Sequence, residues 1–171
     1  FVSFARKRLT GYCTSVNSNR IETSSLFGIG GAMNELDRFV QHDHFAKHID
    51  VEMLEYGAGR AKARMTLRRH HLNSAGMAHG GAIFSLADSV FSAASNSHGT
   101  LAVAINVCIS FFKAAREGTL LAGGREVSRN PKLATYVVDI TDQDGNAIAL
   151  FQGTVYRKKD SLAEVLKAPP A

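Results

Sequence analysis

The sequence has few cysteines and no long run of apolar residues. Cys13 and Cys108 are the two cysteines in 171 residues, too few for a disulfide framework. Because Cys108 lies within an apolar stretch, we expect a reducing compartment rather than secretion. The longest apolar stretch, TLAVAINVCISFF, is interrupted by Asn106 and falls short of the roughly 18 residues that a membrane helix requires. The sequence therefore predicts no contact with a membrane.

Motifs for nucleic-acid recognition are also missing, although the chain is basic. Its 20 Lys and Arg residues exceed its 15 Asp and Glu residues, but they are scattered. No helix-turn-helix, zinc-finger or aromatic RNA-binding pattern accompanies them, so we expect no nucleic-acid partner. A positive balance also suits a small ligand that carries several phosphates, such as a coenzyme. With 45% hydrophobic residues, the composition is typical of a soluble globular domain.

The first 32 residues differ in composition from the rest of the chain. They contain four basic residues, one acidic residue and several Ser and Thr residues. We interpret residues 1–32 either as an added or mistranslated extension or as an organellar targeting segment, poorly ordered in both cases. The protein is expected to be cytoplasmic, or organellar if this leader is a transit segment. The predicted domain spans residues 33–160, and residues 161–171 are predicted to be a C-terminal tail.

Hydrophobic periodicity predicts one helix over residues 33–49 and a longer helix over about 79–97. The longer helix has a single apolar stripe, formed by Ile83, Leu86, Ala87, Val90 and Ala94. Alternating patterns and turn residues predict six strands, near residues 50–59, 60–69, 101–112, 119–127, 133–141 and 146–158. One long apolar helix among six strands favours an α+β domain in which a curved antiparallel sheet wraps around a central helix.

The segment HLNSAGMAHGGAIFSLAD, residues 71–88, combines a loop and the start of the long helix. The first turn of a helix exposes unpaired N–H groups and the positive end of the dipole, so Gly80 and Gly81 predict a place for an oxyanion. His79 and Asn73 can add side-chain donors that orient a carbonyl oxygen. Asp88 supplies a carboxylate that can attack directly or take a proton from water. The segment therefore predicts a hydrolytic site.

The spacing of these groups predicts a second copy of the chain. Gly80 and Asp88 lie roughly 12 Å apart along one helix, so a single carbonyl group cannot contact both. Asp88 also lies off the apolar stripe, on a face with small and polar residues such as Ser85 and Ser92. An antiparallel copy of the helix would bring Gly80 of one chain beside Asp88 of the other. The alternatives are plain turn chemistry for the glycines and a solvated or capped carboxylate for Asp88.

The run HLNSAGMAHGGAIFSLADSVFSAASNSHG resembles the hotdog-fold thioesterases of the phenylacetic-acid-degradation (PaaI) type, whose pattern has an Asn, then His-Gly-Gly, then Leu-Ala-Asp. The resemblance covers about residues 40–158 and includes ISFFKAA and ALFQGTVYR, where that family has core strands. It implies a hotdog fold, a homodimer with shared active sites that forms a dimer of dimers, and hydrolysis of acyl-CoA thioesters. No metal or cofactor is implied, because coenzyme A is part of the substrate.

The resemblance also assigns roles to residues. Asn73, His79 and Gly80 would bind the carbonyl group, and Asp88 would be the nucleophile or the general base. A related branch has a Ser or Thr after the helix, where this chain has AVAIN with Ala104, so that position is given no role. The acyl group is expected to be arylacetyl or medium-chain. Two rival functions are a non-catalytic acyl-CoA-binding or sensor protein and a hotdog hydratase, and the carboxylate of Asp88 favours the enzyme.

Further contacts are predicted for the two ends of the substrate. Gly81 and Phe84 are expected near the acyl group. The phosphates of coenzyme A need exposed basic residues, and the turn SRNPK and the strand end YRKK offer four: Arg129, Lys132, Arg157 and Lys158. Ordinary strand-end charges are the alternative for each of the four. His42, His44 and His48 have a spacing seen in metal sites, but no further ligand completes a set, so no metal is predicted.

Overall fold

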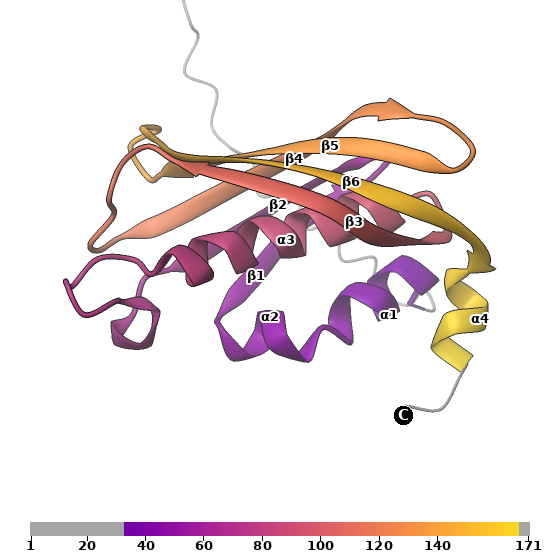
Figure 1. The fold of residues 1–171 in the computed structure, drawn as a ribbon. Helices are drawn as coiled ribbons and strands as arrows, with labels where there is room; N and C mark the ends of the chain where they lie inside the picture. Colours follow the sequence, from indigo (N-terminus) through magenta and orange to yellow (C-terminus); the bar gives the residue numbers. More distant parts are fainter. Residues whose placement is uncertain (1–32, 168–171) are drawn as a thin grey trace, which may run out of the picture. The chain divides into compact units, whose positions relative to one another are not determined.

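The computed structural model describes residues 33–167, which form one antiparallel sheet curved around one long helix (Figure 1). The sheet order is β1-β2-β4-β5-β6-β3, and all neighbouring strands are antiparallel. The strands are β1 Val51–Gly57, β2 Arg60–Thr66, β3 Thr100–Phe111, β4 Thr119–Arg129, β5 Leu133–Asp142 and β6 Ala147–Ser161. The predicted fold class, the six strands and the long helix are confirmed.

The long helix, α3, spans Gly80–Asn96 and forms the centre of the hydrophobic core. All five residues of the predicted stripe are buried, with Leu86, Ala87 and Val90 fully inaccessible. They pack against strand residues that are equally buried, including Met65, Tyr136 and Phe151. Because burying one large apolar side chain contributes about 1.5–3 kcal/mol, this stripe fixes the position of α3 along its whole length.

Two glycines of the sheet allow α3 to approach closely. A Cβ atom at Gly124 would lie 2.6 Å from Cγ1 of Val90, and one at Gly153 would lie 2.7 Å from Cζ of Phe91. Both distances are far below a van der Waals contact, so any larger residue would push the helix away from the sheet. These glycines therefore set the spacing between α3 and strands β4 and β6.

Two shorter helices precede the sheet, where the sequence predicts one helix over residues 33–49. α1 spans Glu35–Gln41 and α2 spans His44–His48. The prediction of a single helix is wrong because Asp43 begins a new helix: its side chain accepts a hydrogen bond from the backbone N of Ala46 at 2.8 Å. Figure 1 shows both helices on the side of α3 that faces away from the sheet.

The chain continues past the last strand into a further helix, α4, at Leu162–Lys167. These residues belong to the segment predicted as a tail, yet Leu162 is fully buried and α4 contacts α1. A short 3-10 turn at Arg69–His71 precedes the loop before α3. None of the helices within residues 33–167 is long and apolar enough to cross a membrane. The predicted leader, residues 1–32, lies outside the described residues.

Strand β3 forms an edge of the sheet and pairs only with β6 among the described strands. Several of its apolar side chains are exposed: Val103, Ile105, Val107 and Phe111. The apolar pattern of a strand does not distinguish a buried central strand from an edge. A long apolar edge strand presents unpaired N–H and C=O groups to a further strand.

We expect Gly124→Ala to lower the free energy of unfolding by about 1–3 kcal/mol, the usual effect of overpacking a core. Gly123→Ala is the matched control, because a Cβ atom at this neighbouring position would have no atom within 4 Å. Denaturant unfolding of both variants measures the difference. Equal stabilities would contradict the close approach of Val90 to β4.

Candidate active site

His79 shapes the N-terminus of α3. It is the N-cap residue of this helix, and its Nδ1 accepts a hydrogen bond from the backbone N–H of Gly81 at 2.9 Å. A neutral imidazole with an accepting Nδ1 carries its proton on Nε2. His79 is exposed, so this Nε2–H can donate to a ligand. His79 can therefore cap α3 through Nδ1 and still donate to a ligand through Nε2, as predicted. The N–H of Gly81 is already hydrogen-bonded to His79.

The backbone N–H of Gly80 is the second donor at this end. Within residues 33–167 it makes no hydrogen bond, as is usual for the first residue of a helix. The ring of Phe111, from the end of β3, lies beside it: a Cβ atom at Gly80 would be 3.3 Å from Cζ of Phe111. A glycine keeps the space above this N–H open to an incoming oxygen atom.

Asn73 holds the loop that precedes α3. Its Oδ1 accepts hydrogen bonds from the backbone N of Ala75 at 2.9 Å and of Met77 at 3.2 Å. Its own backbone N donates to the carbonyl of Met77 at 2.7 Å. Only the Nδ2 group of this side chain is thus available to bind a carbonyl oxygen. The sequence predicts the ligand contact but does not reveal the structural role.

Asp88 lies two turns into α3, partly buried and without a hydrogen bond or ion pair among the described residues. Burial raises the pKa of its carboxyl group, and the negative charge of Asp43 raises the pKa further. α3 is unbroken between Gly80 and Asp88, so the separation of roughly 12 Å holds. One chain therefore contains both predicted groups, the donors at Gly80 and the carboxyl group of Asp88, but does not bring them together.

The four predicted phosphate contacts share one end of the sheet, but they differ in their surroundings. Arg157 donates to the carbonyl of Asn130 at 3.0 Å, and its backbone N donates to the carbonyl of Lys132. Arg129 is ion-paired with Glu126, at 3.2 Å. Lys158 is exposed and follows Arg157 in β6, so it points to the opposite face of the sheet.

This basic end of the sheet is far from Gly80 of the same chain. Arg157 pairs with Ala102 near the start of β3, whereas Gly80 lies beside Phe111 at its end. Nine residues of strand separate these positions, or about 30 Å. The structure thus does not gather the predicted phosphate contacts around the predicted carbonyl site of one chain.

Phe84 and the histidines have contacts that the sequence did not predict. Phe84 packs edge-on against Phe151, with ring centroids 5.6 Å apart, so it belongs in part to the core. Among the described residues, possible metal ligands gather only at Asp50, His70 and His71. His71 uses Nδ1 to accept from the backbone N of Arg68, and its Nε2 hydrogen-bonds the carbonyl of Ile49. Neither ring nitrogen is left for a metal.

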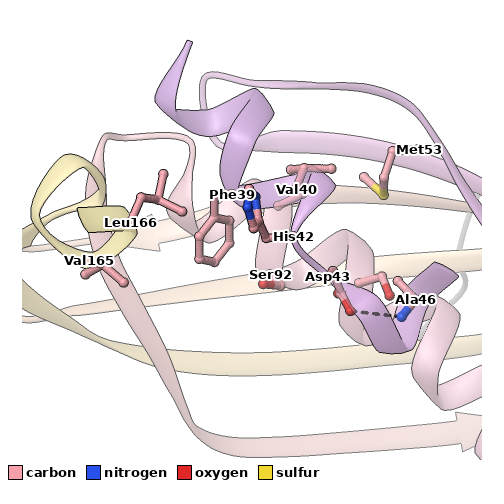
Figure 2. Close-up of a pocket in the computed structure, with 11 residues that line it drawn as sticks. Phe39, Val40, His42, Asp43, Ala46, Met53, Ser92, Val165 and Leu166 are labelled. Carbon is pink, nitrogen blue, oxygen red and sulfur yellow. Dashed lines mark hydrogen bonds between the residues drawn. The ribbon is translucent and has the colours of Figure 1, made fainter. Parts of the chain in front are cut away.

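A cavity of about 310 Å³ lies beside α3, and we call it the helix cavity (Figure 2). It is enclosed by side chains from α1, α2, β1, α3 and α4. Asp43 lines it, as do Ser89 and Ser92, which follow Asp88 on α3. Sequence reasoning missed Asp43 and the cavity, because both depend on how α1, α2 and α4 pack on α3.

A single long helix wrapped by a six-stranded antiparallel sheet defines a hotdog-fold domain. The thioesterase superfamily model matches residues 75–149. A protein of Archaeoglobus fulgidus, named as an esterase, is 46% identical to this chain over 122 residues. The match covers 71% of this chain and 79% of that protein. The acyl-coenzyme A thioesterase PaaI of Escherichia coli is 33% identical over 118 residues, covering 68% and 84% of the two chains.

The solved structures agree with this likeness. The E. coli PaaI protein from the phenylacetic acid degradation operon superposes with a TM-score of 0.71 at 28% identity, over 77% of this chain and 99% of that one. The chain therefore belongs to the thioesterase superfamily, as a PaaI-like member with the hotdog fold. It is a thioester hydrolase.

We expect Asp43→Asn to move the acidic limb of the pH profile of kcat/KM to lower pH. The negative charge of Asp43 disfavours the ionised form of Asp88, so its removal lowers the pKa of Asp88. If Asp88 is the predicted base, it then stays ionised in more acidic solution. Asn caps a helix as well as Asp does, so α2 is retained. Low ionic strength makes the shift easiest to measure.

The control is Asp139→Asn, which removes the same charge from an exposed position on β5. If the acidic limb of the pH profile does not move in Asp43→Asn, then either Asp88 does not determine this limb or Asp43 does not affect the pKa of Asp88.

Proposed function

We propose that the protein is an acyl-CoA thioesterase that releases free acid and coenzyme A from an arylacetyl or medium-chain acyl-CoA. The observation that carries this proposal is Asp88, a partly buried carboxyl group with a raised pKa and no partner among the described residues. It shares α3 with the N–H of Gly80, for which residues 33–167 supply no acceptor. The names of the E. coli relative and its operon support this substrate class.

The proposed reaction uses protein groups alone. Asp88 takes a proton from a water molecule, and the oxygen of this water attacks the thioester carbonyl carbon. The developing oxyanion accepts hydrogen bonds from the N–H of Gly80 and the Nε2–H of His79, while the Nδ2 of Asn73 orients the carbonyl group. Collapse of the tetrahedral intermediate breaks the C–S bond, and the thiolate of coenzyme A leaves. No step needs a metal or a further cofactor.

The proposal requires two chains for each active site. The exposed apolar edge of β3 favours antiparallel pairing with β3 of a second copy, which extends the sheet and buries this edge. The two α3 helices then run antiparallel, and Gly80 of each chain can face Asp88 of the other. A dimer of dimers would cover apolar side chains that remain exposed on β4, β5 and β6: Leu121, Val127, Leu133, Leu150 and Tyr156.

The same pairing gives the basic end of the sheet a role. A two-fold axis near the middle of β3 places the start of this strand level with the end of the partner's β3. Arg157 and Lys132 of one chain then lie at the end of the sheet where the other chain carries Gly80. Arg157 on β6 is two strand spacings, about 10 Å, from the partner's β3, and Lys132, directly before β5, is one spacing further; coenzyme A spans both distances easily. We propose that these two residues bind its phosphates.

A non-catalytic acyl-CoA-binding protein is the main rival. Such a protein gains nothing from Asp88, because a buried carboxylate without a partner lowers stability and repels the phosphates of the ligand. The position of Asp88 lowers stability, and a role as a base in a reaction gives a reason for this loss.

We expect Asp88→Asn to lower kcat by about 100-fold or more, the scale of a lost general base. The folded state raises the pKa of Asp88, so its ionised form is less stable there than in the unfolded chain. The variant should therefore unfold at an equal or higher denaturant concentration at neutral pH. Free-thiol release from octanoyl-CoA and phenylacetyl-CoA measures the activity, with Asp139→Asn as the control. Unchanged turnover would remove Asp88 from the mechanism.

A further inference from the structure

The helix cavity is lined mainly by apolar side chains, and its polar residues are His42, Asp43, Ser89 and Ser92 (Figure 2). Its walls come from three helices and one strand that are distant in the sequence. Phe39 and Val40 of α1, Ala46 of α2 and Met53 of β1 form one side, and Val165 and Leu166 of α4 form another. Ser89 and Ser92 of α3 contribute hydroxyl groups to the lining.

Asp88 does not line the cavity itself, but it adjoins residues of α3 that do. Ser89 follows Asp88 directly, and Ser92 lies one helical turn further along α3. Asp43 lines the cavity and is close enough to Asp88 to influence its ionisation. A group held in the cavity would therefore extend away from Asp88 within the same chain.

We propose that the helix cavity holds the acyl group of the substrate and that α4 sets the length of acyl group that fits. This inference rests on the proposed function, because it assumes that the thioester carbonyl lies at Asp88. The acyl group then lies in the chain that supplies Asp88, and the second chain of the dimer binds the carbonyl oxygen. The residue predicted to contact the acyl group, Phe84, does not line this cavity.

The cavity is half-open, and its volume indicates the size of acyl group that it can hold. A volume of about 310 Å³ equals roughly ten times the share of one water molecule in the liquid, and a methylene group is of similar size. An apolar acyl group of about eight to ten carbon atoms therefore fits, either as a linear chain or as an arylacetyl group. Chains that are much longer meet Val165 and Leu166 of α4.

A chain-length series tests this proposal directly. The variant Ser92→Phe fills part of the cavity, and Ser92→Ala is its matched control. Each methylene group that enters an apolar site improves kcat/KM about fourfold, so the native protein should gain this factor per carbon up to about decanoyl-CoA. Ser92→Phe should lower kcat/KM for octanoyl-CoA and phenylacetyl-CoA at least about tenfold, because two or more methylene equivalents are excluded. The acetyl group is too short to fill the cavity, so the loss for acetyl-CoA should be much smaller than the loss for octanoyl-CoA.

A second pair of variants tests the opposite wall. Leu166→Phe narrows the cavity from α4, and Lys167→Phe adds the same ring at a neighbouring exposed position. Leu166→Phe should shorten the preferred acyl chain, and Lys167→Phe should not. The ratio of phenylacetyl-CoA to octanoyl-CoA hydrolysis in the native protein distinguishes an aromatic from an aliphatic substrate.

The outcomes separate this inference from the proposed function. If Ser92→Phe and Leu166→Phe lower the activity toward all chain lengths equally, or toward none, the cavity does not hold the acyl group although the protein is a thioesterase. If the native protein hydrolyses no acyl-CoA of the series, the proposed function itself fails.

Discussion

The rigid packing of α3 against the sheet is the constraint on which the rest of the structure depends. Gly124 and Gly153 let the helix approach the sheet so closely that a Cβ atom at either position would overlap with Val90 or Phe91 of α3. A straight helix keeps residues eight positions apart at a separation of roughly 12 Å. The donors at its N-terminus and the carboxyl group of Asp88 therefore cannot meet within one chain. The proposed dimer and the proposed shared site both follow from this separation.

The surroundings of Asp88 link stability to the proposed chemistry. Burial and the charge of Asp43 raise the pKa of this carboxyl group, which makes its ionised form both less stable and a stronger base. An acyl group in the helix cavity would exclude more water from the surroundings of Asp88. The ionised carboxylate would then be still less stable and still more basic. The cost of an unpartnered carboxyl group is offset by the large apolar core on the other side of α3.

Most of the fold could be predicted from the sequence, because local patterns decide it. The alternating residues of β2 and the stripe from Ile83 to Ala94 directly indicate which side of each element is buried. The sequence also contained the signal for α4. Ser161 and Glu164 form a reciprocal cap, in which the N of Ser161 donates to Oε2 of Glu164 and the N of Glu164 donates to Oγ of Ser161.

The candidate site was predictable only where its residues are neighbours in the sequence. Asn73, His79, Gly80 and Asp88 lie in one segment, and their types suggest their chemistry. The effect of Asp43 on Asp88 and the walls of the helix cavity depend on contacts between distant helices, which no local pattern encodes. The distance between Arg157 and Gly80 likewise depends on the strand order, because β6 and β3 are neighbours that run in opposite directions.

The sharing of one active site between two chains is tested most directly by activity in mixed dimers. One variant carries Asp88→Asn, and the other carries Asn73→Ala together with His79→Ala. In a mixed dimer of a shared-site enzyme, one site contains both lesions and the other contains none. Random pairing makes about half of the dimers mixed, so co-expression should restore roughly a quarter of the native activity. Activity no higher than the average of the two parent variants, with mixed dimers confirmed by differential tagging, would contradict the shared site.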